Sequence, residues 1–422
     1  MNAHSDMPVS VNKHYLRAAR VDQDNVEDVA ASYVVSASVT ALIENLSEHQ
    51  ARTGQGAFTW TGPYGSGKST LALVLAGLLG GPEVQRKAIA KTIDYKEAES
   101  LWEGLPPGPN GWQFINVVGS NTSPSELLKR ALREQGLLKG KRITDEKRLV
   151  DVLLELSQAD AESGGIIVVF DELGKCLESI ASGEGDAYFF QLLAEAASRS
   201  NGRLIFIGIL HQAFQEYASK LAREVRDEWS KIQGRFVDLS VNLTAGEQIE
   251  LIANAIDAQD APETFRRECR KLDELLADSS PSQFGYSQEA AFARAWPLHP
   301  LVTALLGPIS RRSYGQNQRS IFSFLASAER YGLQDFLSTP ANSKNRSYEL
   351  ADLWDYLETN LHSSIAVSLD GHHFASAQDA ASRAVSLENA GLAIKVIKTI
   401  SLLEFTSRST GLAARKPILL AS

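Results

Sequence analysis

The chain has 422 residues, of which 44% are apolar and 22% are charged, and its formal net charge is −9. This length predicts two or three domains of about 150 residues each, and the composition excludes collagen-like, coiled-coil and wholly disordered proteins. The acidic balance also excludes a protein that coats nucleic acid by bulk positive charge.

Strand and helix patterns alternate from residue 51 to residue 243. Residues 1–50 begin polar and continue with the apolar spacing of an N-terminal helical segment. A strand pattern at 57–61 leads into a glycine-rich stretch and then into a buried helix at 71–79. Further strands are predicted at 112–118, 165–170, 203–210 and 236–241. This alternation predicts an α/β core with a doubly wound parallel sheet.

The pattern becomes helical from residue 244 onward. The helices predicted over 244–337 form a lid after the core, and turn residues from 338 mark a linker. The last segment, 338–422, contains an amphipathic helix at 387–403 and then a short turn, which is similar to the start of a winged-helix unit. Because the chain stops on the apolar residues 418–420, we expect this unit to be truncated.

The glycine-rich stretch satisfies the P-loop pattern Gly-x4-Gly-Lys-Ser, with a strand before it and a helix after it. Glycines allow backbone N–H groups to curl around phosphates, and the following helix directs its N-terminus at the same charge. Lys68 would contact the β and γ phosphates, and the Ser69 hydroxyl would bind Mg²⁺. The pattern therefore predicts a site for ATP and Mg²⁺, formed by Gly62, Pro63, Tyr64, Gly65, Ser66, Gly67, Lys68, Ser69 and Thr70. The alternative is a chance glycine turn.

The third core strand ends in Asp171 and Glu172. An Asp at the carboxyl end of such a strand lies beside the P-loop and can hold the metal, and a Glu after it can polarise the attacking water. The alternative is a helix-capping Asp and a surface Glu. The base-reading motif of GTPases and the signature of ABC transporter ATPases are missing. We therefore favour ATP hydrolysis, with Asp171 as metal ligand and Glu172 as catalytic residue.

With these two motifs the chain resembles the AAA+ ATPases over residues 20–335, particularly the branch that contains the replication initiators. It is also similar to large ATP-binding proteins of bacterial anti-phage systems such as BREX. The resemblance implies a polar sensor after the fourth strand, which His211 or Gln212 would supply. It also implies an arginine that acts on a neighbouring subunit's γ-phosphate, matched by Arg235, and a lid arginine, matched by Arg319.

Each of these family assignments has a structural alternative. Arg235 and Arg319 can be ordinary salt-bridge or exposed arginines. His211 can be a core histidine, because the family more usually carries an Asn at that position. Tyr33 can lie near the adenine or pack in the core, and core packing is the favoured role.

The P-loop and the Asp-Glu pair are further apart here than is usual in the family. The additional residues lie around 83–111 and 136–160, and such insertions commonly carry partner contacts. Lysines and arginines are concentrated at 129–148. This charge is compatible with a nucleic-acid backbone contact and with a solvated helix face, and the lack of interleaved aromatic residues favours the solvated face.

The chain shows no sign of a secreted or membrane-bound protein. Cys176 and Cys269 lack close-spaced partners, which excludes a metal knuckle and a disulfide framework. The longest apolar run is too short to cross a bilayer, and the first residues lack a basic-then-apolar leader. We therefore expect a cytoplasmic protein without a membrane partner, which forms a homo-oligomer or a hetero-complex with a second effector protein. Nucleic acid is a further candidate partner.

Three functions remain open at this level. The first is an AAA+-like machine whose ATP hydrolysis remodels a nucleic-acid or protein partner, in anti-phage defence by the resemblance above. The second is a nucleotide-gated signalling scaffold with slow hydrolysis. The third is a small-molecule phosphotransferase, which is disfavoured because the Asp-Glu pair fits water activation and no acceptor site is evident.

Overall fold

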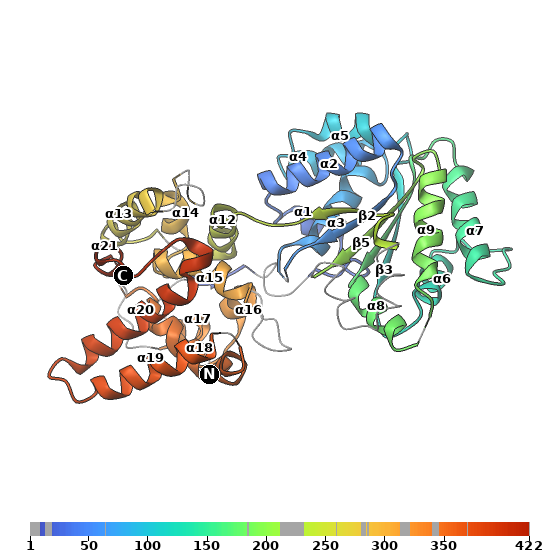
Figure 1. Ribbon diagram of the computed structural model, residues 1–422. Helices are drawn as coiled ribbons and strands as arrows, with labels where there is room; N and C mark the ends of the chain where they lie inside the picture. Colours follow the sequence, from blue (N-terminus) through green and yellow to red (C-terminus); the bar gives the residue numbers. More distant parts are fainter. Residues whose placement is uncertain are drawn as a thin grey trace, which may run out of the picture. The chain divides into compact units, whose positions relative to one another are not determined.

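The structure is a computed structural model in which the chain forms two compact units, Ala18–Asn242 and Met1–Arg17 with Leu243–Ser422 (Figure 1). The division lies where the sequence pattern changes from alternating strands and helices to helices alone. The residues that the structure describes are 9–12, 19–63, 65–183, 185–211, 232–258, 260–279, 284, 287–312, 321–339, 346–368 and 370–421.

The first unit is built around a five-stranded parallel sheet with the strand order β3-β4-β5-β2-β6. The strands are β2 (Ala57–Thr61), β3 (Trp112–Val118), β4 (Gly165–Asp171), β5 (Leu204–Leu210) and β6 (Val237–Ser240). Every residue of β4 and β5 is buried, as is typical of strands covered on both faces. The prediction of an α/β fold with a parallel sheet is confirmed, and each strand lies within one residue of its predicted bounds.

Alternate side chains of the sheet enter two separate apolar clusters. Ile167 and Val169 of β4 pack on one face with the helices α1 (Val26–Ala30), α2 (Ala37–Thr53), α3 (Lys68–Leu79), α4 (Glu83–Thr92) and α5 (Ala98–Gly104). Val168 and Phe170 pack on the other face with α6 (Pro124–Glu134), α7 (Glu146–Ala159), α8 (Leu173–Ala181) and α9 (Tyr188–Arg199). Figure 1 shows the two helical layers with the sheet between them.

The connections between the strands reverse direction within this sheet. Helix α3 leaves β2 over one face, whereas α6 and α8 leave β3 and β4 over the other face. Where neighbouring connections diverge in this way, a crevice opens at the carboxyl ends of the strands, and ligands of such folds bind there. The ends of β2 and β4, with β5 between them, flank this reversal.

The second unit is mainly helical. Its helices are α12 (Ala245–Ala255), α13 (Glu263–Ser279), α14 (Glu289–Arg294), α15 (Pro300–Ser310), α16 (Ile321–Ala326), α17 (Leu333–Ser338), α18 (Leu350–Ala366), α19 (Gly371–Ala384), α20 (Ala390–Thr410) and α21 (Lys416–Leu419). A short antiparallel pair, β1 (Val9–Val11) with β7 (Ile256–Ala258), joins the start of the chain to it. The first 50 residues are thus shared between the two units, because α1 and α2 pack on the parallel sheet.

One apolar cluster extends through the second unit from Val11 to Ile418. The segments predicted as a lid, 244–337, and as a separate C-terminal unit, 338–422, therefore share one core. A winged-helix module would add a β-hairpin, but the regular elements within the described part of 346–421 are all helices. None of the helices in the described ranges combines the length and the apolar character that a bilayer span requires.

The packing of Phe206 gives a first test of the core. This β5 side chain is 1% exposed, and its ring centroid lies 5.6 Å from Phe170, 6.1 Å from Phe190 and 5.7 Å from Phe236. Phe206→Ala should lower the free energy of unfolding by about 3–5 kcal/mol, because it leaves a cavity among these rings. Urea denaturation of the full chain measures this, with Val84→Ala, at a residue that is 80% exposed, as a nearly neutral control. An unchanged midpoint in Phe206→Ala would contradict the packing.

Candidate functional site

The glycine-rich loop connects β2 to α3 at the carboxyl edge of the sheet. Gly65 and Gly67 have φ angles of 75° and 80°, which favour glycine, and Gly67 begins α3 without a side-chain cap. A Cβ on Gly62 would lie 2.5 Å from the carbonyl oxygen of Val241, whereas a Cβ on Gly67 would meet nothing within 4 Å. The start of α3 therefore has uncapped N–H groups and open space beside Gly67, as a phosphate site requires.

Lys68 is buried at the centre of this loop, with an exposed fraction of 4%. Its ammonium group donates to the carbonyl oxygens of Gly62 (2.7 Å) and Pro63 (2.8 Å) and to Oγ of Ser66 (3.1 Å). Burial lowers the pKa of Lys68 to about 8, although the negative charge of Asp171 acts in the opposite direction. The lysine is thus held by the oxygens of its own loop, and an incoming phosphate would exchange with these acceptors.

Asp171 lies at the end of β4 and is 5% exposed. Its carboxylate accepts hydrogen bonds from the Ser69 side chain and, at 2.9 Å, from the backbone N–H of Glu172. Burial raises the pKa of Asp171 above its usual value, and these two hydrogen bonds oppose that effect. The structure thus joins the two oxygen groups that the sequence predicts as metal ligands. Within the described ranges no larger cluster of metal-ligating side chains occurs, and Mg²⁺ needs none, because it keeps waters and substrate phosphates.

Glu172 begins α8 in the left-handed region, with φ 54° and ψ 38°. This conformation is uncommon for a residue with a side chain and is often found at functional sites. Its carbonyl oxygen lies 2.2 Å from where a Cβ on Gly119 would be, so the exit of β3 tolerates only glycine there. The carboxylate forms an ion pair of 2.5 Å with Lys175. Sequence reasoning missed Lys175, although its position three residues into a helix after Glu172 was a usable signal.

His211 follows β5, the strand between β2 and β4. Burial, followed by the charges of Lys68 and Lys175, lowers the pKa of His211 to about 3. The imidazole is therefore neutral at physiological pH and close to both lysines. The structure thus brings the end of β5 to the same edge as Lys68 and Asp171. The predicted site residues Tyr64 and Arg319, and the alternative sensor Gln212, lie outside the described residues.

Arg235 lies at the amino ends of the strands, opposite to the ends that carry the P-loop and Asp171. It immediately precedes the region of β6, which runs parallel to β2, so it is near the amino ends of the strands and away from its own P-loop. Its guanidinium is 3.3 Å from the carboxylate of Glu195, and its side chain is 43% exposed. The two residues line a surface pocket of about 450 Å³ with Gln55 and Arg199. An exposed pair of this kind contributes little to stability.

Two further predictions concern residues away from the carboxyl ends of the strands. Tyr33 is half-buried and packs against the apolar cluster on the α3 face. In the basic stretch, Lys129 pairs with Glu126 at 3.0 Å, and Lys141 and Arg148 share Glu155. These ion pairs favour the interpretation of the basic stretch as a solvated face.

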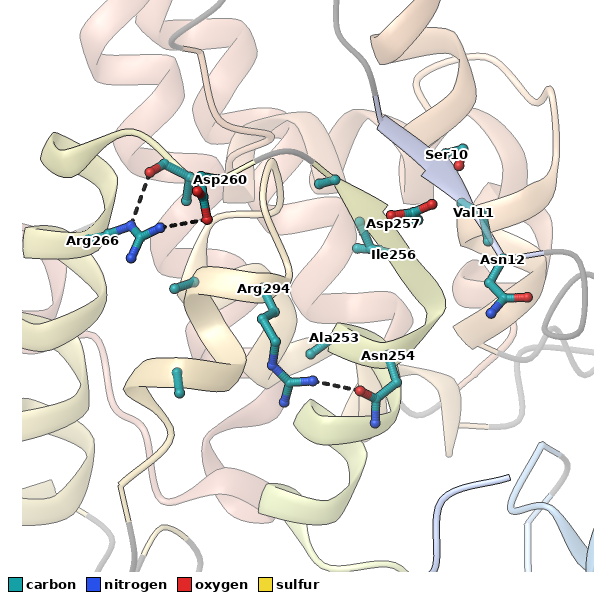
Figure 2. A pocket seen from close by; sticks show the side chains of 14 residues that line it. Ser10, Val11, Asn12, Ala253, Asn254, Ile256, Asp257, Asp260, Arg266 and Arg294 are labelled. Atoms are coloured by element: carbon teal, nitrogen blue, oxygen red, sulfur yellow. Dashed lines mark hydrogen bonds and ion pairs between the residues drawn. The ribbon is translucent and has the colours of Figure 1, made fainter. Parts of the chain in front are cut away.

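Figure 2 shows a cavity of about 830 Å³ in the second unit, between the β1–β7 pair and helices α12 to α14. Arg266 forms an ion pair of 3.0 Å with Asp260, and Arg294 donates to Asn254 at 2.6 Å. Alanines line much of its surface. None of the described residues that the sequence predicts as functional lines this cavity.

Comparisons with known proteins supply no assignment, since no family model and no curated protein matches the chain. The arrangement that bears on function is the group of Lys68, Ser69, Asp171, Glu172 and His211 at the carboxyl ends of the strands.

The lowered pKa of Lys68 predicts a pH dependence of stability. Between about 8 and the ordinary value of 10.5, the unfolded chain binds a proton at this lysine that the folded chain does not bind. The free energy of unfolding of the wild type should therefore rise relative to that of Lys68→Met, by up to about 3 kcal/mol, as the pH increases through this range. Urea denaturation without nucleotide at a series of pH values measures the difference. The difference in unfolding free energy between the wild type and Lys87→Met, a substitution at an exposed lysine, should change much less with pH. A pH-independent difference between the wild type and Lys68→Met would show that the ammonium group is not buried.

Proposed function

We propose that the chain binds ATP with Mg²⁺ at residues 62–70 and hydrolyses it, as an AAA+-like motor or switch that acts on a nucleic-acid or protein partner. The observation that carries the proposal is that P-loop residues interact with the first residue of the Asp-Glu pair. Lys68, Ser69 and Asp171 interact across the gap between α3 and β4, although β5 separates the two strands in the sheet. This is the arrangement that phosphate and metal binding would use.

Each residue has a role that fits its chemistry. Lys68 would contact the β and γ phosphates as a cation, and the N-terminus of α3 would donate backbone hydrogen bonds. The Ser69 hydroxyl and the Asp171 carboxylate would hold Mg²⁺, which when bound neutralises charge on the phosphates. His211, neutral and within reach of the charges of both lysines, would sense the nucleotide as a hydrogen-bonding group.

Glu172 would act on the attacking water. The water oxygen bonds to the γ-phosphorus, while the bond from that phosphorus to the bridging oxygen breaks and ADP leaves with the electron pair. The proton lost by the water passes to the Glu172 carboxylate. No step needs an oxidant or a co-substrate other than water, so the reaction is ATP + H₂O to ADP + phosphate. An ATPase is favoured over a small-molecule phosphotransferase because the Asp-Glu pair fits water activation.

The same proposal includes a role for the second unit and the pathway in which the protein acts. Helices from residue 244 onward would serve as the lid, and the resemblance to BREX proteins supports anti-phage defence. A specific observation favours the second candidate, a nucleotide-gated scaffold with slow hydrolysis. Both Lys68 and Glu172 have partners within the chain, which supports slow hydrolysis.

Two variants separate nucleotide binding from hydrolysis. Lys68→Ala should abolish tight ATP binding, because it removes the cation that faces the phosphates. Glu172→Gln should bind ATP normally while turnover falls by about 100-fold or more, because the amide cannot take a proton from water. Titration with a fluorescent ATP analogue and phosphate release measure the two quantities. Wild-type affinity in a folded Lys68→Ala protein would remove the P-loop assignment, and unchanged turnover in Glu172→Gln would remove Glu172 from the mechanism.

Arg235 provides a test of assembly. Its place at the edge away from its own P-loop supports action on a neighbouring subunit, where an arginine finger contributes about 10³ to 10⁵ in rate in GTPase systems. Arg235→Ala should bind ATP yet hydrolyse it poorly, and a mixture with Lys68→Ala should regain partial activity. In one type of mixed interface an intact P-loop then meets an intact arginine. If the mixture shows only the sum of the separate rates, Arg235 is a structural partner of Glu195 instead.

A further inference from the structure

Lys175 is the nearest charged partner of the proposed catalytic base. It lies in α8, which begins at Glu172, so the helix itself sets the spacing of the two side chains. The Lys175 Nζ atom is 2.5 Å from Oε2 of Glu172, and the side chains are 51% and 32% exposed. One of the two carboxylate oxygens that could accept a proton is therefore occupied by an ammonium group.

The two lysines of the site differ in how readily they can move. Lys68 is buried and donates to three oxygens of its own loop. Lys175 is half exposed, and an exposed ion pair of this kind is weakly held. Both lysines act on the neighbouring His211, whose pKa they lower together with burial. Lys175 is thus within electrostatic reach of the site and is its more exposed cation.

The balance of charge at the site suggests when the pair opens. Lys68 interacts with the carboxylate of Asp171, and Lys175 is paired with that of Glu172. The γ-phosphate of a bound nucleotide would add negative charge near them, and Lys175 is the more exposed of the two cations. A carboxylate released from an ammonium group is free to accept the proton of a water.

We propose that Lys175 is a positioning residue that restrains Glu172, holding its carboxylate in an ion pair until the γ-phosphate of a bound nucleotide draws the lysine away. This inference rests on the proposed ATPase function. It makes Lys175 a brake on turnover that acts through Glu172 rather than on the phosphate chemistry.

The test is steady-state ATP hydrolysis by the full chain, with ATP and Mg²⁺ and without other partners. Lys175→Ala should raise kcat about two- to fivefold, the range that release of an exposed ion pair allows, and leave KM for ATP within about twofold. Lys175→Arg should restore the wild-type rate, because it retains a cation. Lys129→Ala is the matched control, since Lys129 also pairs with a glutamate three residues earlier on a helix, Glu126, and its turnover should equal that of the wild type.

A double variant identifies the residue through which Lys175 acts. Adding Lys175→Ala to Glu172→Gln should not change the low turnover of Glu172→Gln. An unchanged or lowered kcat in Lys175→Ala, or an increase that persists in the Glu172→Gln background, would overturn the restraint while leaving the ATPase proposal in place. If the wild type neither binds nor hydrolyses ATP, the proposed function and the restraint both fall.

Discussion

The first unit depends on the hydrogen-bond acceptors that surround one buried positive charge. The ammonium group of Lys68 is almost fully removed from water, and such a charge is strongly unfavourable unless oxygen atoms surround it. The loop supplies these oxygens from the backbone of Gly62 and Pro63 and from Ser66. To do so the chain must turn tightly, which explains the left-handed Gly67 and the glycine at 62, where a Cβ would collide with Val241. The loop is thus shaped around a cation before any phosphate binds.

The sheet places the acidic groups where they can meet this cation. Because the connections reverse direction in the sheet, α3 lies over one face and α8 over the other, and both helices start at the carboxyl ends of their strands. Asp171 then reaches the Ser69 hydroxyl across that edge. The close approach of Gly119 to the Glu172 carbonyl fixes the strained backbone that starts α8. Strand packing, loop conformation and electrostatics therefore favour the same geometry.

The charged groups of the site are paired within the chain. Lys68 donates to oxygen atoms of its loop, and Glu172 forms an ion pair with Lys175. The second unit has one continuous apolar core from Val11 to Ile418.

Much of this protein could be predicted from local sequence. The predicted bounds of the five strands each lie within one residue of the observed bounds. The signal is clearest for β4 and β5, because strands covered on both faces need apolar side chains at every position. The P-loop residues and the Asp171-Glu172 pair could also be recognised in the sequence, since phosphate and metal binding would need those residue types at those spacings. Tertiary structure alone decided the strand order, the position of Arg235 at the far edge of the sheet, the pairing of β1 with β7 and the shared core of residues 244–422. These depend on contacts between residues far apart in the chain, for which a local pattern carries no signal. Lys175 stands between the two cases: its spacing from Glu172 is local, but its closeness to His211 exists only because β5 ends beside β4.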